Sequence, residues 1–134
     1  MTTRKPWTPA ENLTVSRLYF DMLEHADAGL QYNKAGMIRE RQTGSYIKMP
    51  CPGIGPLANR SRPSIEAKLM NCSAAHRDLL RAAGFEADGT DATAATMDGH
   101  GYRCLPNYQQ SLRDAMAAEM HRRQQAAFHA ERSA

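Results

Sequence analysis

The stretch from Arg60 to Gly84 constrains the fold more than any other part of this chain. It contains an N-terminal capping signal, a stripe of residues suited to burial, and a C-terminal stop signal, which together predict one long helix. Ser61 is a favoured N-cap residue, and Pro63 is tolerated in a first turn, where its missing N–H would have no intrahelical partner. Residues that suit a buried stripe recur at helical spacing. They are Ile65, Leu69, Cys72, His76, Leu79 and Ala83. Gly84 then predicts the stop, and a kink near Ser73 is the alternative to one continuous rod.

Other segments also carry helix signals. Thr8-Pro9-Ala10-Glu11 is a capping box, which predicts a helix from residue 9 to about residues 25–28, with Trp7 packing back as a hydrophobic staple. Asn33 is expected to cap a shorter helix that fades near residues 42–44. A last helix is expected to begin near residues 106–107. Beyond residue 120 the chain has little apolar face, so we expect a protruding, frayed or partner-dependent end. Residues 45–49 are expected to form a short strand or hairpin arm.

These segments predict an all-α protein with a tri-helical, helix-turn-helix-like core, long loops and an extra C-terminal helix. The 134 residues suffice for one modest core. We expect residues 1–112 to form the helical domain and residues 113–134 to form a C-terminal helical extension. The apolar stripes predict a set of side chains that are buried together. They are Trp7, Leu18, Met22, Ile65, Leu69, Leu79 and Leu112.

The charge of the chain is unevenly distributed. The formal net charge is +3, but residues 33–68 hold seven cations against two anions. The cations are Lys34, Arg39, Arg41, Lys48, Arg60, Arg62 and Lys68. Residues 85–99 hold four acidic residues and neither Lys nor Arg. A basic middle with an acidic stretch elsewhere is typical of a nucleic-acid-binding protein, and it would equally suit an acidic protein partner.

The sequence indicates neither catalytic nor metal chemistry. The three cysteines are odd in number and form no CxxC pair, so we expect no disulfide framework and no zinc site. His76 fits a satisfied, partly buried residue better than a catalytic one, and His100 lies in a turn-rich stretch. We therefore expect no enzyme activity, no cofactor and no metal. The absence of a long apolar run and of a secretory signal predicts a cytoplasmic protein without membrane contact.

Short motifs in a fixed order give the chain a resemblance to a known module. The motifs are Trp7-Thr8-x-x-Glu11, Tyr32-Asn33-Lys34, Arg60-Ser61-x-x-Ser64-Ile65-Glu66-x-Lys68-x-x-Asn71-x-Ser73-Ala74 and Gly101-Tyr102-x-x-x-Pro106-Asn107-Tyr108-Gln109. Their outline is similar to a helix-turn-helix of the Myb or homeodomain type. It more closely resembles the N-terminal recognition module of bacterial HNH-type restriction endonucleases and related defence proteins. No His-Asn-His constellation follows, so the resemblance implies the recognition module alone.

Together, the charge pattern and the resemblance predict a non-enzymatic protein that binds double-stranded DNA with its third helix in the major groove. The contacts expected from this helix and its entry are Arg60, Arg62, Ser64, Lys68 and Asn71. The expected phosphate contacts are Lys34, Arg39, Arg41 and Lys48. Asn71 is the best candidate for reading an adenine, although it could instead cap or brace a neighbouring loop.

Two alternatives remain open. The first is a small inhibitor or adaptor of a nuclease or defence complex, of bacterial or phage type, that binds a protein and never touches DNA. The second is that the polar side of the third helix is an ordinary solvated face. A palindromic DNA target would require a homodimer, which the tail helix could supply.

Overall fold

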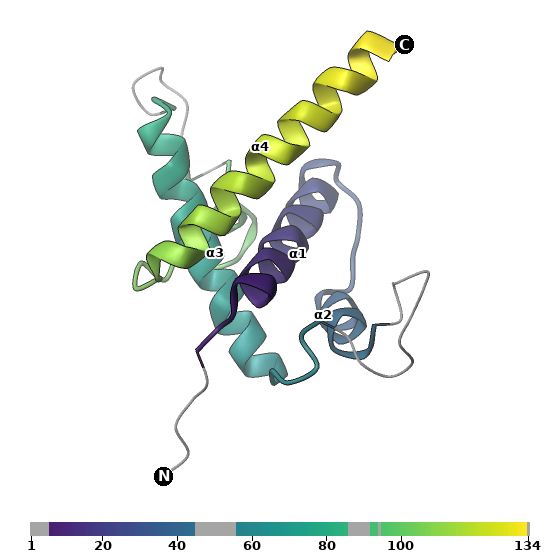
Figure 1. The fold of residues 1–134 in the computed structure, drawn as a ribbon, viewed down its shortest axis with the longest axis vertical. Helices are drawn as coiled ribbons and strands as arrows, with labels where there is room; N and C mark the ends of the chain where they lie inside the picture. The colour runs from purple at the N-terminus through teal and green to yellow at the C-terminus, as the bar shows by residue number, and fades with distance from the viewer. Residues whose placement is uncertain (1–5, 45–55, 86–91, 94, 134) are drawn as a thin grey trace.

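The computed structural model describes residues 6–44, 56–85, 92–93 and 95–133. In these residues the chain forms helices α1 (Pro9–Asp27), α2 (Lys34–Thr43), α3 (Arg62–Ala82) and α4 (Gln110–Ser133), with a short 3-10 helix η1 (Met97–His100). Helices α1, α3 and α4 pack on one another, and α2 packs against α1 and α3 at the side (Figure 1). The predicted all-α class is confirmed. The strand expected at residues 45–49 lies outside the described residues.

The helices begin where their capping residues predict. Thr8 and Glu11 form the complete capping box of α1, Asn33 Oδ1 accepts from the Gly36 N–H, and Ser61 Oγ accepts from the Ser64 N–H. Helix α3 runs through Ser73 without a break, which favours the rod over the kink. The chain leaves α2 and α3 through two glycines with positive φ, at residues 44 and 84, a conformation that suits a residue without a Cβ.

Helix α4 begins later than the sequence predicts, at Gln110 rather than near Pro106. The residues before it are held against α3 instead, because the Leu105 N–H donates to the Met70 carbonyl at 3.2 Å. From about residue 124 onward the described side chains of α4 are exposed, and the helix extends beyond the other three (Figure 1). The expected protruding tail is therefore confirmed, and it is helical.

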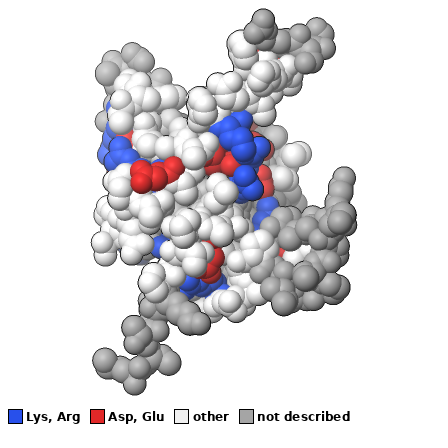
Figure 2. All heavy atoms as spheres, in the orientation of Figure 1, with Lys and Arg blue, Asp and Glu red and all other residues white. Residues whose placement is uncertain are grey.

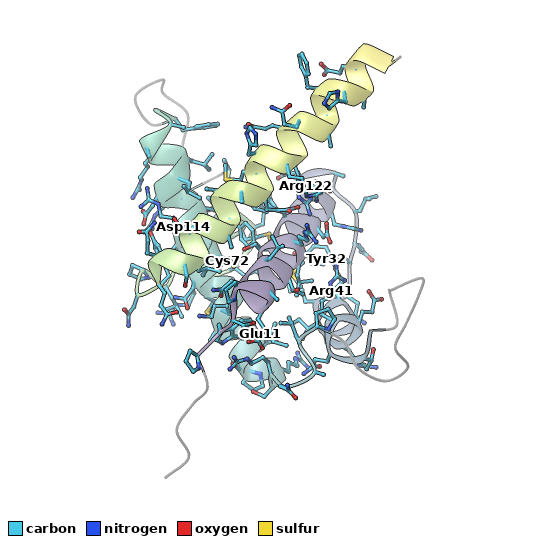
Figure 3. The ribbon with its side chains drawn as sticks, viewed as in Figure 1. Glu11, Tyr32, Arg41, Cys72, Asp114 and Arg122 are labelled. Atoms are coloured by element: carbon cyan, nitrogen blue, oxygen red, sulfur yellow. The ribbon has the colours of Figure 1, made fainter. Side chains whose placement is uncertain are left out.

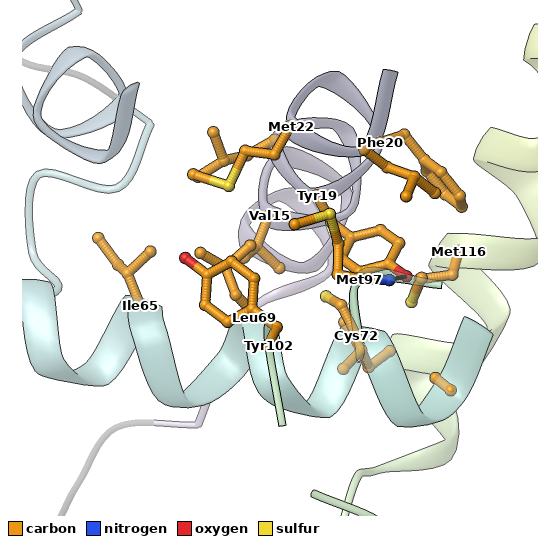
Figure 4. Close-up of a cluster of buried hydrophobic side chains, with 14 of the residues drawn as sticks. Val15, Tyr19, Phe20, Met22, Ile65, Leu69, Cys72, Met97, Tyr102 and Met116 are labelled. Atoms are coloured by element: carbon orange, nitrogen blue, oxygen red, sulfur yellow. Dashed lines mark hydrogen bonds between the residues drawn. The ribbon is translucent and has the colours of Figure 1, made fainter. Parts of the chain in front are cut away.

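The core lies where α1 crosses α3 under α4. Figure 4 shows the α1 side chains meeting those of α3, with a contribution from α4. Buried members include Val15, Leu18, Tyr19, Met22, Ile65, Leu69, Cys72, Leu112 and Met116. Five of the seven predicted core residues are buried, but Trp7 and Leu79 are only partly buried at its margin. At this margin the Trp7 ring packs against the core and carries two cations, Arg60 and Lys68, over it.

One buried polar contact crosses this core. The phenol oxygen of Tyr19 lies 2.8 Å from Nδ1 of His76 and also accepts from the Met97 N–H at 3.1 Å. Burial lowers the pKa of His76 to about 4, so its imidazole is neutral near neutral pH. His76 is thus a satisfied buried residue, as the sequence predicts.

The helix-turn-helix arrangement within this fold is not confirmed. Helices of that motif are joined by a turn of about three or four residues, whereas residues 44–61 separate α2 from α3. Most of the core comes from α1, α3 and α4, and α2 adds Ile38 from the side. The C-terminal extension expected from residue 113 onward contributes buried side chains. Met116 and Glu119 belong to it, and both are buried in the packing of α4 on α1. None of the described helices has the length and apolar character that a membrane span requires.

Candidate nucleic-acid interface

A groove of about 840 Å³ runs along the N-terminal half of α3. Its walls come from the segment before α1, from the first three turns of α3 and from the end of the loop that precedes α4. Four of the predicted DNA-binding residues line it, namely Arg60, Ser64, Lys68 and Asn71. The described lining also includes Trp7, Asn59, Ser61 and Gln109, and it contains no acidic residue.

Hydrogen bonds to Glu11 and to the Pro6 carbonyl fix the Arg60 side chain in one wall of this groove. Its Nε and Nη2 donate to the two carboxylate oxygens of Glu11, each at 2.7 Å, and Nη2 also donates to the Pro6 carbonyl at 2.8 Å. The guanidinium lies over the Trp7 ring, 4.8 Å from its centroid. The hydrogen bonds from Arg60 hold the pKa of Glu11 at about 2. Glu11 lies in the first turn of α1, and Figure 3 labels it at that N-terminal end. Arg60 therefore fixes the shape of the groove more than it adds uncompensated charge.

Lys68 is the cation in this groove that is best placed to bind an anionic ligand. It is partly buried, and its Nζ lies 5.0 Å from the centroid of the Trp7 ring. It forms no salt bridge with any residue that the structure describes. Burial lowers its pKa, because an ammonium that is partly shielded from water is less stable in its charged form. An anion in the groove would restore favourable interactions that Lys68 lacks.

Asn71 closes the far end of the groove. Its Nδ2 donates to the Leu105 carbonyl at 2.9 Å and to the Asn107 carbonyl at 3.4 Å. These bonds brace the loop before α4, which is the second role that the sequence left open for Asn71. Adenine readout by asparagine uses both Oδ1 and Nδ2, so such readout would require these two bonds to break.

The remaining predicted residues do not join this groove. Arg62 is exposed at the start of α3, where its Nε lies 3.0 Å from Glu66. Lys34 lies over the ring of Tyr102, 4.3 Å from its centroid, and Arg39 is exposed on α2. The last two are Arg41, which is buried against α1, and Lys48, which lies outside the described residues.

Arg41 belongs to an ion-pair network on another part of the surface. Its Nη2 lies 2.7 Å from Asp21 Oδ2, and its side chain is only 10% exposed. Figure 2 shows basic and acidic atoms gathered where α4 crosses α1, the region in which Figure 3 labels Arg122. Arg41 therefore anchors α2 to α1, and the predicted cations do not share a single surface.

Sequence reasoning did not assign several polar or aromatic lining residues to the site, namely Trp7, Asn59, Ser61 and Gln109. The sequence predicts a hydrophobic staple for Trp7, because an aromatic residue just before a capping box usually packs back on its own helix. In the structure its ring lies against Arg60 and Lys68, which are more than 50 residues away in the sequence. No local signal in the sequence joins these segments.

The described residues offer no site for a metal ion from three or more His, Cys, Asp or Glu side chains. Burial raises the pKa of the Cys72 thiol and of the partly buried Cys104 thiol, so neither is an activated nucleophile. Comparisons with protein-family models, with curated proteins and with solved structures find no match for this chain. The resemblance to a recognition module of HNH-type endonucleases therefore stays a prediction from the sequence.

Proposed function

We propose that this protein binds double-stranded DNA through the N-terminal half of α3 and the groove beside it. The observation that carries the proposal is the composition of the groove. It combines an aromatic ring, the ammonium of Lys68, the Glu11-paired Arg60 and several amide and hydroxyl groups, with no acidic side chain among its described lining residues. Positive charge with hydrogen-bond donors is what a phosphate backbone requires, and phosphate contacts supply most of the affinity of DNA-binding proteins.

The N-terminal end of α3 favours the same ligand. The first turn of α3 contains no acidic residue, so its helix dipole is uncompensated there. Its backbone donors are largely used, because the Ser64 N–H bonds to Ser61 Oγ and Pro63 has no N–H. The helix end therefore contributes its field, while direct donors would come from the exposed Arg62 and from Lys68.

The contacts within the groove favour backbone binding over base readout. Arg60 is held by Glu11, and the amide nitrogen of Asn71 is held by two carbonyls. Phosphate contacts confer affinity without sequence information. We infer that binding depends strongly on salt and only weakly on sequence.

The direct test measures binding of a fluorescently labelled random duplex by anisotropy over a series of salt concentrations. The double variant Arg62→Gln/Lys68→Gln should weaken binding and reduce the slope of log K against log salt by about one unit for each phosphate interaction that the variant removes. Glutamine retains part of each side-chain stem, so packing against Trp7 is partly preserved.

Arg81→Gln is the matched control, because it removes an exposed cation from the opposite end of the same helix. Arg62 and Arg81 are about 28 Å apart along the axis, at about 1.5 Å per residue. The control should bind as the parent does. If the double variant binds duplex DNA with the parent's affinity and salt slope, the proposal is wrong, and binding of an acidic protein partner becomes the leading function.

A further inference from the structure

A second concavity, of about 340 Å³, lies between α1, α2 and α4 and is distinct from the groove beside α3. Its described lining is dominated by arginines. The lining residues are Thr14, Arg17, Asp21, Arg41, Pro56, Arg122 and Arg123. Four guanidinium groups thus face one space with a single carboxylate, Asp21, among the described lining residues. We call this space the arginine pocket.

A buried carboxylate beneath the pocket orients three of these arginines. The side chain of Glu119 is 0% exposed, and it accepts from Arg17 Nε at 3.1 Å, Arg122 Nε at 2.8 Å and Arg123 Nε at 2.7 Å. Burial alone would raise the pKa of Glu119, but the hydrogen bonds from Arg122, Arg123 and Arg17 hold it at about 2. Glu119 therefore remains charged at neutral pH and fixes the direction of each guanidinium.

Asp21 completes the frame from the side of α1. It receives Arg41 Nη2 at 2.7 Å on one oxygen and Arg123 Nη2 at 2.8 Å on the other. Arg123 also reaches Glu24, so all three of its nitrogens are used. Arg41 also pairs with Glu40 at 3.4 Å, so Arg41 and Arg123 are fixed by the fold and their charge is largely offset by carboxylates.

Arg17 and Arg122 have guanidinium N–H groups that the described residues do not use as hydrogen-bond donors. Within the part of the chain that the structure describes, Arg17 donates only its Nε, and Arg122 donates its Nε and Nη2. Their side chains are 48% and 53% exposed, so these outer N–H groups are within reach of a ligand. Because Glu119 already holds both guanidinium planes, little conformational entropy would be lost when they bind.

We infer that the arginine pocket binds a phosphate group. Guanidinium forks match tetrahedral oxyanions through paired, charge-assisted hydrogen bonds, which is why arginine predominates in phosphate recognition. A pocket of this size accepts a phosphate with a small organic group attached. The phosphate could belong to a free small molecule or to a nucleic-acid backbone. The inference is independent of the proposed DNA groove, because the two share no lining residue.

The test titrates the intact chain with inorganic phosphate by isothermal calorimetry, with chloride balancing the ionic strength. Arg17→Gln is the informative variant, since Arg122 and Arg123 still bond to Glu119 and we expect the helical circular dichroism of the parent to be retained. We expect phosphate to bind the parent and Arg17→Gln to bind it roughly tenfold more weakly, as expected when one charge-assisted hydrogen bond is removed. Lys68→Gln removes a cation of the groove beside α3 and leaves the arginine pocket intact, so phosphate binding that survives in Lys68→Gln and is weakened in Arg17→Gln belongs to the arginine pocket. Absence of binding by the parent, or equal binding by Arg17→Gln, would overturn the inference.

A second arm identifies the source of the phosphate. The random duplex is titrated into the parent and into Arg17→Gln under identical salt conditions. If Arg17→Gln binds inorganic phosphate more weakly and also lowers the affinity for duplex, the pocket holds the DNA backbone. If it binds phosphate more weakly with unchanged duplex affinity, the pocket holds a separate phosphorylated small molecule. Both results support the phosphate site, and neither depends on Lys68, whose effect tests the DNA groove.

Discussion

Replacing Glu119 by Gln should cost this protein about 2–4 kcal/mol of unfolding free energy. The carboxylate is fully buried and is shared by three arginines, and removing one partner of a buried ion pair typically costs about 3–5 kcal/mol. We set the range lower because Arg17 and Arg122 are about half exposed and regain water when they lose Glu119. Glutamine keeps the volume and one acceptor, but its amide hydrogens would face the guanidinium groups.

Urea denaturation followed by circular dichroism measures this cost. Glu24→Gln is the matched control, since Glu24 also pairs with Arg123, at 2.6 Å, but its side chain is 68% exposed. An exposed pair of this kind is worth less than about 1 kcal/mol.

The pH dependence supplies an independent check. The pKa of Glu119 is about 2 in the fold and 4.5 as its ordinary value, so its contribution is fully present above pH 4.5 and is lost as the pH falls toward 2. Glu119→Gln should lose less stability over that range than the parent does. Equal costs for Glu119→Gln and Glu24→Gln would refute the view that burial makes this carboxylate special.

Two further predictions concern the core. Leu69→Ala should destabilise the fold by about 2–5 kcal/mol, because the leucine is fully buried, whereas Leu30→Ala, at a side chain that is 59% exposed, should change stability by less than about 0.5 kcal/mol in the same urea experiment. The pKa of His76 is about 4 in the fold, against an ordinary value of 6.5. Between these two pH values the unfolded chain binds more protons than the folded chain. The free energy of unfolding should therefore fall as the pH drops from 6.5 to 4, by at most about 3 kcal/mol. A titration of the His76 ring by NMR with a midpoint near 6.5 would contradict this burial.

Local chemistry in the sequence was enough to predict the helices. Thr8, Asn33 and Ser61 each cap the helix that follows, because side-chain capping depends only on residues within one turn. The start of α4 was predicted wrongly, since the residues before it bond to Met70, which lies far away in the sequence. Tertiary contacts of this kind override the local preference for a helix.

The candidate site was harder to predict than the fold. Charge counting grouped Arg41 with Arg60, but the fold directs Arg41 to Asp21 and Arg60 to Glu11. The number of cations in a segment does not reveal which of them a distant carboxylate will neutralise. For the same reason, the sequence does not single out Arg122 and Arg123, which lie in a tail expected to make few contacts, although their partner Glu119 is the most deeply buried acid described.

The pairing of α1 with α4 has a consequence for how this chain reaches its native state. The contact between Arg17 and Glu119 joins residues that are 102 positions apart. Closing a loop of that length costs about 4 kcal/mol in chain entropy, from the logarithmic dependence on loop size. Distant pairings of this kind slow folding relative to a helical bundle built only from neighbours in sequence. A nascent chain that has not yet supplied residues 112–123 would leave the α4-facing part of α1 and α3 exposed, so the core closes fully only when the last helix is present.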